Sequence, residues 1–267
     1  MPNAETLCRD LARIRAVAPL VHNITNFVVM NSTANALLAL GASPVMAHAA
    51  EEVDEMTGIA KAVVINIGTL SAPWIEAMRM AVRSAAALGK PWVLDPVGAG
   101  ASRVRTETSL ALTRVAPPAV IRGNASEILA LRGGEAGTKG VASIHASEAA
   151  LGAAKALASA IGCVVSVSGE VDLITDGNAL IRVANGHPLM PRVTGLGCAA
   201  TAITGAFAAI NPDPLEAAAH AMSIMGMAGE MAMEKAAGPG TLQLHFLDAL
   251  YAISEADIAR RLRMSAG

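Results

Sequence analysis

A glycine-flanked cysteine opens an uncharged, apolar segment late in the chain, the stretch VTGLGCAATAITGAF from Val193 to Phe207. A helix that begins near Gly197 or Cys198 would present backbone N–H groups without intrahelical partners, at the positive end of its dipole. Glycines let a phosphate approach that backbone closely. One interpretation is an anion hole for a transferring phosphoryl group. The other is a helix cap packed against a sheet, with Cys198 as a small buried residue.

The segment differs from two common phosphate-binding motifs. A P-loop would have a Lys after its glycines, and none follows here. A dinucleotide-binding fingerprint would have a third glycine and a place after the first strand of its fold. Any anion hole at Cys198 therefore belongs to another class of site.

Polar residues also follow five of the predicted strands. They lie in the ranges 24–26, 66–69, 95–100, 122–127 and 168–172. Gly, Asn and Asp are common in ordinary loops, which is the alternative reading of each cluster. In an open parallel sheet, however, ligands bind beyond the carboxyl ends of the strands. Five such clusters at one edge of one sheet predict a polar cleft.

The elements that would position these residues alternate between strands and helices. Strands are expected at 19–23, 43–47, 62–68, 91–95, 119–123 and 163–169, and helices at 33–40, 72–88, 107–115 and 147–161. A hairpin is expected from 171–175 to 179–183, with Asp176-Gly177 as a type I′ turn. After Gly197 the chain is expected to be mostly helical. The strands are continuously apolar, which favours one α/β domain over residues 1–267 with helices on both faces of a mostly parallel sheet.

Composition narrows the class of protein. Of the 267 residues, 53% are hydrophobic but only 2% are aromatic, so Ala, Val, Leu, Ile and Met are expected to build the core. The net charge is -2 and the basic residues are dispersed, which argues against a nucleic-acid partner. The uncharged run 193–212 is long enough to span a membrane, but its Gly, Thr and Ala content predicts a buried helix instead. Three widely spaced cysteines and no secretory signal indicate a cytoplasmic protein without disulfides.

Several stretches of the chain, taken together, resemble the hydroxyethylthiazole kinase family of the ribokinase-like superfamily. The matching stretches include PLVHNITNFVVMNSTANALLALGASPVMAHAAEEV, VVINIGTL, LDPVGAGASRVRTET, IRGNASEI, SVSGEVDLI, VTGLGCAATAITGAF and GPGTLQLHFLDAL, in the family's order. The resemblance implies a three-layer ribokinase-like fold. It also implies phosphorylation of 4-methyl-5-(2-hydroxyethyl)thiazole by ATP with Mg²⁺, in a homotrimer whose thiazole sites lie between subunits.

The resemblance also implies roles for individual residues. Cys198 matches the catalytic position. The thiazole-pocket positions are Asn26, Met46, Gly68 and Gly195; the ATP positions are Arg122, Asn124, Ser168, Thr194 and Gly197; the acidic residues around Mg²⁺ are Asp95 and Glu127. Arg122 could instead form a surface salt bridge, Glu127 could cap a helix, and a Met is usually a core residue. His22 and His48 are expected to be packing residues.

Cys198 stands where the superfamily at large has Asp. An unperturbed thiol has a pKa of about 8.5 and is mostly neutral at pH 7, although a helix N-terminus can lower that pKa and generate some thiolate. Because phosphoryl transfer has a loose transition state, early deprotonation of the alcohol need not dominate. We therefore expect Cys198 to orient or weakly activate the substrate hydroxyl without forming a covalent bond. The alternatives are a kinase of the same fold for another alcohol, and an inert nucleotide-binding protein.

Overall fold

The computed structural model describes residues 2–133 and 144–267, without the side chains of 144–149. Its strands form one sheet in the order β2-β1-β3-β4-β5-β6-β7-β8-β9. The strands are β1 (Leu20–Ile24), β2 (Ser43–Val45), β3 (Ala62–Asn66), β4 (Trp92–Asp95), β5 (Val120–Asn124), β6 (Val164–Ser168), β7 (Asp172–Thr175), β8 (Leu180–Val183) and β9 (Met264–Ala266). The pairs from β2 to β6 are parallel and those from β6 to β9 are antiparallel. The expected mostly parallel α/β sheet is confirmed.

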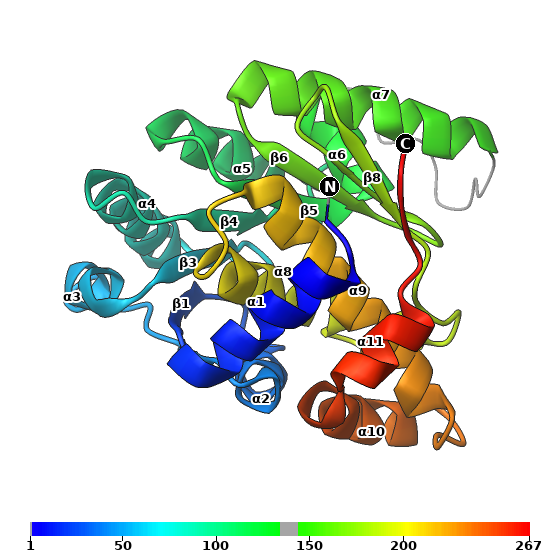
Figure 1. Cartoon of the computed structure of the whole chain (residues 1–267). Coiled ribbons are helices and arrows are strands. Elements are labelled where there is room, and N and C mark those ends of the chain that lie inside the picture. The colour runs from blue at the N-terminus through cyan, green and yellow to red at the C-terminus, as the bar shows by residue number, and fades with distance from the viewer. Residues whose placement is uncertain (1, 134–143) are drawn as a thin grey trace.

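Helices cover both faces of this sheet, as Figure 1 shows. One face carries α3 (Val53–Ile59), α4 (Ala72–Ala87), α5 (Arg103–Val115), α6 (Ala125–Leu131) and α7 (Ile144–Ile161). The other face carries α1 (Ala4–Val17), α2 (Met30–Leu40), α8 (Leu196–Ala208), α9 (Pro214–Met233), α10 (Pro239–Ala252) and α11 (Glu255–Arg261), and the short 3-10 helix η1 spans Met190–Arg192. The result is three layers.

The apolar strands alternate between the two cores. Val63 and Ile65 of β3 pack with the α4 side, whereas Val64 between them packs with the α8 side. Because successive side chains of a strand point to opposite faces, a strand covered on both sides must be apolar throughout. This explains why the continuously apolar runs identified the sheet.

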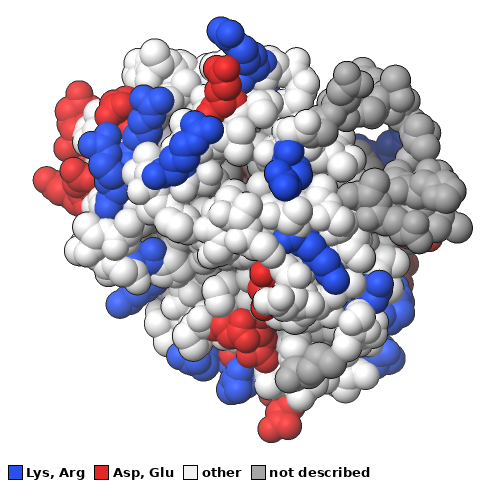
Figure 2. Space-filling view, turned by 90° about the horizontal axis from the view of Figure 1, so that it is seen from above, with Lys and Arg blue, Asp and Glu red and all other residues white. Residues whose placement is uncertain are grey.

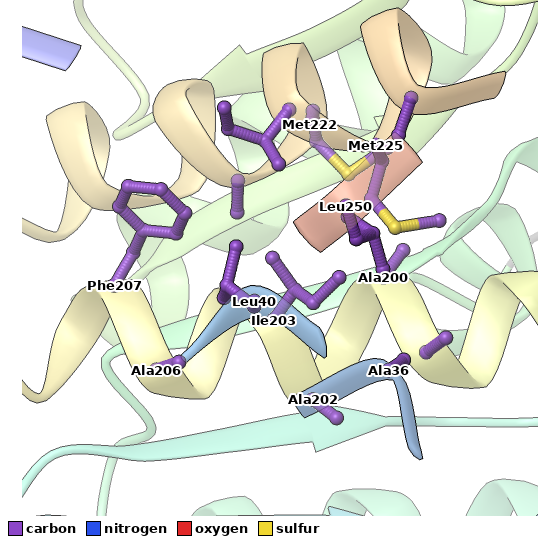
Figure 3. Packing of buried hydrophobic residues seen from close by; sticks show 14 of the residues in the cluster. Ala36, Leu40, Ala200, Ala202, Ile203, Ala206, Phe207, Met222, Met225 and Leu250 are labelled. Carbon is purple, nitrogen blue, oxygen red and sulfur yellow. The ribbon is translucent and has the colours of Figure 1, made fainter. Parts of the chain in front are cut away.

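Helix α8 is buried along its length, with every side chain from Ala199 to Ala208 in the interior. Figure 3 shows Ile203, Ala206 and Phe207 of α8 among Leu40 of α2 and Met222 of α9. The uncharged run 193–212 is therefore a core helix and the loop after it. Within the described ranges, no helix has the length and apolar character that a bilayer crossing needs.

Two details differ from the sequence-based expectation. The hairpin exists, but its turn is not type I′, which needs positive φ at both central residues. Only Gly177 has one, at 102°, because the Asp176 carboxylate accepts hydrogen bonds from the amides of Asn178 and Ala179 at 2.8 and 2.7 Å and holds a wider loop. The region after Gly197 is mostly helical, as expected, but it also contains strand β9, which pairs with β8.

The surface carries few charges. Figure 2 shows one face on which acidic and basic side chains are interspersed and most of the area is uncharged. The low charged fraction of 16% is thus visible as broad neutral areas between scattered charges.

Candidate active site

Helix α8 begins at the carboxyl edge of the parallel strands. It begins at Leu196, one or two residues earlier than expected, and Gly195 before it has φ 87°. A Cβ on Gly195 would lie 3.0 Å from Val29 Cγ1, so glycine allows both the backbone conformation and the close approach to the loop before α2. The first helical hydrogen bond runs from Ala199 N to Gly195 O at 2.8 Å. The amides of residues 196–198 therefore precede the helical ladder and are available to an anion.

Asn66, the last residue of β3, connects several polar groups at this edge. Its Oδ1 accepts hydrogen bonds from Asn26 Nδ2 at 2.8 Å and from Gly68 N at 3.0 Å. Its Nδ2 donates to Asp95 Oδ2 at 2.7 Å. A Cβ on Gly68 would lie 2.6 Å from Asn26 Nδ2, so the glycine leaves room for the Asn26 side chain. The structure therefore joins Asn26, Gly68 and Asp95 through a residue that sequence reasoning did not assign to the site.

Asp95 at the end of β4 is only 2% exposed. Its Oδ2 also accepts a hydrogen bond from Thr201 Oγ1 of α8 at 2.8 Å. Burial raises the pKa of Asp95 to about 7, although the nearby positive charge of Arg122 lowers it. A carboxyl that titrates near neutral pH, at the mouth of a helix N-terminus, is typical of a functional position.

Cys198 lies in the first turn of α8 and is partly buried. Its Sγ accepts a hydrogen bond from Asn26 Nδ2 at 3.5 Å. Burial, together with the negative charge of Asp95, raises the pKa of Cys198 to about 11, while hydrogen bonds from Asn66 and Asn26 lower it. Burial disfavours the charged thiolate, so the raised pKa of Cys198 agrees with the mostly neutral thiol expected at pH 7.

Arg122 of β5 lies against the start of α8 rather than on the surface. It is 9% exposed, and its guanidinium donates to Gly197 O at 3.0 Å. A Cβ on Gly197 would lie 3.0 Å from the same Arg122 nitrogen. Among the described residues, Nε of Arg122 has no hydrogen-bond partner. A buried arginine with a donor to spare, beside the free amides of a helix, suits an anion.

Glu127 caps a helix. Its Oε2 accepts from Asn124 N at 2.8 Å, and the Asn124 side chain accepts from Glu127 N at 3.0 Å, so the pair forms the capping box of α6. Glu127 Oε1 accepts from Gly98 N at 2.8 Å. The alternative role considered for Glu127 is therefore present. Each carboxylate oxygen has a second lone pair, so capping leaves it able to bind water or a cation.

The carboxylates at this edge of the sheet supply part of a magnesium coordination sphere. Carboxylate oxygens are the ligands that Mg²⁺ prefers, and it usually retains water and substrate phosphate oxygens as further ligands. Asp95 and Glu127 are close enough for the negative charge of Glu127 to raise the pKa of Asp95. Among the residues whose side chains the structure describes, 2–133 and 150–267, no group of three or more His, Cys, Asp or Glu side chains could hold a metal ion. Two carboxylates fit a cation that arrives with phosphate, not one held by protein alone.

The remaining predicted positions lie around this cluster. Ser168 Oγ at the end of β6 donates to Gly123 O at 3.3 Å, and Thr194 is an exposed residue just before Gly195. Asp172 fixes the turn after Ser168 by accepting from Gly169 N at 3.0 Å, and burial raises the pKa of Asp172 to about 6. Met46 follows β2 and is half-buried. No hydrogen bond in the described structure joins Met46 or Thr194 to the Asn66–Asp95 group.

The two histidines near the site pack as expected. His22 is buried, with Nδ1 3.1 Å from Thr57 Oγ1 and Nε2 2.8 Å from Ala47 O, and burial lowers the pKa of His22. His48 is exposed, and its ring meets that of Trp74 edge-on at 4.6 Å between centroids. The Phe27 ring also packs against the Trp74 ring, with 4.2 Å between the ring centroids and an angle of 35° between the ring planes. Three aromatic rings thus lie beside the residues that follow β1, β2 and β3.

Sequence reasoning missed three residues of the site. Asn66 was recognised only as a strand-end polar residue, and Thr201 follows Asp95 by 106 positions, so nothing local relates them. Arg105 of α5 holds the loops in place by donating to Val97 O at 2.6 Å and Gly68 O at 2.8 Å. For Asn66 and Thr201 the available signal was a polar residue in an otherwise apolar strand or helix; Arg105 lies in the polar sequence RVRTETSLALTRV and gave no such signal.

Comparison with known proteins decides the family. The sequence model of the Hydroxyethylthiazole kinase family matches residues 11–256. The chain belongs to this family. It is 60% identical over 255 residues to the hydroxyethylthiazole kinase of Syntrophus aciditrophicus, covering 95% of this chain and 94% of the relative. It is 54% identical to that of Nitratidesulfovibrio vulgaris, covering 99% of each chain. The chain is therefore an enzyme of a kinase family.

Solved structures agree. The structure of a hydroxyethylthiazole kinase protein from Pyrococcus horikoshii OT3 has a TM-score of 0.92 and 47% identity, covering 98% of this chain and 99% of that one. A pyridoxal kinase from Staphylococcus aureus, at 16% identity, has a TM-score of 0.66 over 93% of this chain and 97% of that one. The second likeness shows the fold alone, and with a ribokinase-like protein from Enterococcus faecalis at TM-score 0.62 it supports the expected ribokinase-like fold.

Proposed function

We propose that the chain transfers the γ-phosphoryl group of ATP to the primary hydroxyl of 4-methyl-5-(2-hydroxyethyl)thiazole, and so serves thiamine salvage. One observation carries the proposal: the free amides of residues 196–198, the buried guanidinium of Arg122 and the Asn26–Cys198 contact meet at the start of α8. The amides and Arg122, which attract negative charge, thus lie beside Asn26 and Cys198, which can hold an alcohol.

Phosphoryl transfer needs positioning and charge stabilisation more than covalent chemistry. The amides at the start of α8 would receive the developing charge on the transferred group, and Arg122 would donate its unpartnered Nε to a phosphate oxygen. Ser168, Asn124, Thr194 and Gly197 surround this end and would contact the nucleotide. Burial of the cluster strengthens each of these interactions because water is excluded.

Mg²⁺ would neutralise phosphate charge when bound. Asp95 and Glu127 would hold it, directly or through water, and the hydrogen bonds from Asn66 and Thr201 would keep the Asp95 carboxylate in one orientation. Glu127 would do this while capping α6, since each of its oxygens accepts one of these hydrogen bonds, from Gly98 N or from Asn124 N, and keeps a second lone pair.

The alcohol end of the site would be formed by Asn26, Met46, Gly68 and Gly195. A neutral Cys198 thiol would orient the substrate hydroxyl by hydrogen bonding, rather than remove its proton fully. The raised pKa of Cys198, about 11, supports this division of roles. A thiol held by Asn26 has no need to become a nucleophile in such a transfer.

We also propose that the protein is a cytoplasmic homotrimer with the thiazole sites between subunits. Large apolar side chains are exposed near the edge strand β2: Phe27 at 66%, Val28 at 68%, Leu38 at 58% and Ile59 at 62%. Exposed apolar area of this kind marks an interaction surface. Light scattering that gives the mass of a single chain at assay concentration would contradict the trimer.

An assay of ADP release with thiazole alcohol, hydroxymethylpyrimidine and pyridoxal in parallel tests the function. We expect turnover with the thiazole alcohol at least about 100-fold above the other two, because a site built for one ring leaves polar groups unpaired with another. Preference for pyridoxal would replace the proposed substrate. ATP binding without ADP formation would indicate an inert nucleotide-binding protein.

The nucleotide role of Arg122 has its own test. Arg122→Ala should raise the KM for ATP by about 10- to 100-fold and leave thiazole-alcohol affinity nearly unchanged, because a lost charge-assisted hydrogen bond costs about 1.5–3 kcal/mol. Arg122→Lys is the matched control, which keeps the charge but not the two-pronged geometry. Equal losses for both ligands would contradict the assignment.

A further inference from the structure

Backbone N–H groups determine how the buried side-chain amides of Asn26 and Asn66 are oriented beside the start of α8. Gly68 N donates to Asn66 Oδ1 at 3.0 Å, and Val28 N donates to Asn26 Oδ1 at 3.1 Å. A backbone N–H can only donate, so the oxygen of each side-chain amide must face it. The nitrogens of both amides are thereby directed to the opposite side, where they must find acceptors.

Those acceptors belong to the reacting parts of the site. Asn66 Nδ2 donates to Asp95 Oδ2 at 2.7 Å, and Asn26 Nδ2 donates to Asn66 Oδ1 at 2.8 Å and to Cys198 Sγ at 3.5 Å. Each hydrogen bond in this series, from Asn26 through Asn66 to Asp95, therefore has a fixed donor and a fixed acceptor. Because Cys198 Sγ accepts from Asn26, its own hydrogen is free to point elsewhere.

One side chain therefore joins both halves of the site. Asn66 is 2% exposed and holds Asn26 and Gly68 by its oxygen and Asp95 by its nitrogen. Thr201 Oγ1 donates to the same Asp95 oxygen at 2.8 Å, which leaves Asp95 Oδ1 as the oxygen not claimed by these two donors. An apolar residue at this position would leave Gly68 N, Asn26 Nδ2 and Asp95 Oδ2 without the partner that Asn66 gives them.

We propose that Asn66 is a positioning residue for phosphoryl transfer, which sets the alcohol-binding residues and the Asp95 carboxylate in register with each other. This inference rests on the proposed function. The acceptor side of Asn66 positions the substrate alcohol through Asn26 and Gly68. The donor side positions Asp95 Oδ1 toward the phosphates. Substrate and phosphate then meet at the correct separation because one amide spans both.

Two substitutions separate these sides. Asn66→Asp keeps an oxygen for Gly68 N and Asn26 Nδ2 but replaces the amide donor by a second carboxyl, which must share a proton with Asp95 or repel it, whereas Asn66→Ala loses both sides. We expect kcat to fall about 100-fold in each variant, as a misplacement of about 1 Å does. Calorimetry without nucleotide should give a thiazole-alcohol Kd within about threefold of the parent for Asn66→Asp, and about tenfold weaker for Asn66→Ala.

A second pair tests the donor side independently. Thr201→Val removes the other hydrogen bond to Asp95 Oδ2, and Thr201→Ser retains it. Thr201→Val should lower kcat by about tenfold with unchanged thiazole-alcohol affinity, and Thr201→Ser should behave as the parent does. The calorimetric stoichiometry gives the fraction of competent protein, so kcat can be corrected for any loss of folding.

The results are decisive in either direction. A kcat for Asn66→Asp within threefold of the parent would overturn the proposal, and so would equal losses of thiazole-alcohol affinity in Asn66→Asp and Asn66→Ala. A parent protein that makes no ADP from thiazole alcohol would overturn the proposed function, and this inference with it. An active parent with the expected split would support both.

Discussion

Helix α8 has a buried polar cluster at each end, and the two clusters differ in how completely their hydrogen bonds are satisfied. At its start lie Asn26, Asn66, Asp95, Cys198 and Thr201, which we call the carboxyl-edge cluster. Beyond its end lie Thr6, Asp10, Asn211 and His220, which we call the Asp10 cluster. Both clusters join segments that are distant in the sequence, and both are shielded from water.

The Asp10 cluster is closed. His220 uses both ring nitrogens, at 3.0 Å from Asp10 Oδ2 and 3.1 Å from Thr6 Oγ1. Asp10 also accepts from Asn211 Nδ2 at 2.6 Å and from Arg9 Nε at 3.1 Å. A buried polar network in which every member is paired fixes the structure. It offers nothing to a ligand.

The carboxyl-edge cluster is open. The neutral thiol of Cys198 can still donate, Arg122 Nε beside it lacks a partner among the described residues, and the amides that begin α8 precede the helical ladder. Such unpaired groups lower stability, and they persist where a ligand completes them. The comparison shows that these two clusters, both rich in buried polar groups, differ in whether donors are left over for a ligand.

Replacing Asp95 should give the largest effect. Asp95→Asn keeps an oxygen for Thr201 and Asn66 but removes the charge, so kcat/KM should fall by about 1,000-fold. Burial raises the pKa of Asp95 to about 7, so the folded state retains a proton that the unfolded state loses above about pH 4. Stability is therefore lost as pH rises toward and through 7. Urea denaturation at pH 8 should show the variant to be more stable, by on the order of 1–3 kcal/mol.

Replacing Asp10 should have the opposite effect to replacing Asp95: it should lower stability and leave activity nearly unchanged. Asp10→Ala leaves His220 Nδ1 buried without its partner and leaves Asn211 Nδ2 with Glu216 as its one remaining acceptor in the described structure, which should lower the free energy of unfolding by about 3 kcal/mol. Its kcat per folded molecule should stay within about twofold of the parent. Urea denaturation and active-site calorimetry measure the two quantities. A tenfold loss of kcat in fully folded protein would refute the separation of the two clusters.

Cys198 should contribute a smaller, kinetic effect. Cys198→Ala should lower kcat by about 10- to 100-fold, less than the loss of a full general base, and leave thiazole-alcohol affinity within about threefold. Cys198→Ser keeps a donor and an acceptor and should recover part of the rate. Abolished thiazole binding in Cys198→Ala, or a phosphorylated Cys198 trapped during turnover, would contradict the orienting role.

The smallest effect concerns the pH dependence of stability. Burial is the main cause of the lowered pKa of His220, so protonation opposes folding and the stability present above pH 6.5 is lost as pH falls below it. Between pH 7 and 5, the parent should lose about 1 kcal/mol more than His220→Gln does. The difference between the two proteins cancels the contributions of His22 and Asp95. Parallel curves would show that His220 does not carry this dependence.

The sequence predicted the sheet well, because the apolar runs that form its strands are a local pattern. Continuous apolar runs identified β3 and β6, and glycines before Cys198 identified the start of α8. Strand β9 was missed because three residues without alternation pair with β8 only through the tertiary fold. The turn at Asp176 was wrong because a side chain, not the Asp-Gly pair, determines the loop.

The sequence named candidate residues at the carboxyl edge, but it did not predict the hydrogen bonds between them. Nothing in the sequence relates Thr201 to Asp95 or Asn66 to Asn26, since those contacts depend on which side chains meet across strand ends. The neutral state of the Cys198 thiol was expected from its unperturbed pKa, but the burial that raises this pKa is visible only in the structure.

Gly205 links these observations to the mechanics of the protein. A Cβ at this position would lie 2.5 Å from Val64 Cγ2 and 3.3 Å from Val21 Cγ1, so α8 rests directly on the centre of the sheet. Any larger residue at position 205 would push against the sheet near the middle of α8 and tilt the helix, so that its two ends would move in opposite directions. A single methyl group, remote from every reacting atom, would thus disturb phosphate capture and thermal resistance together.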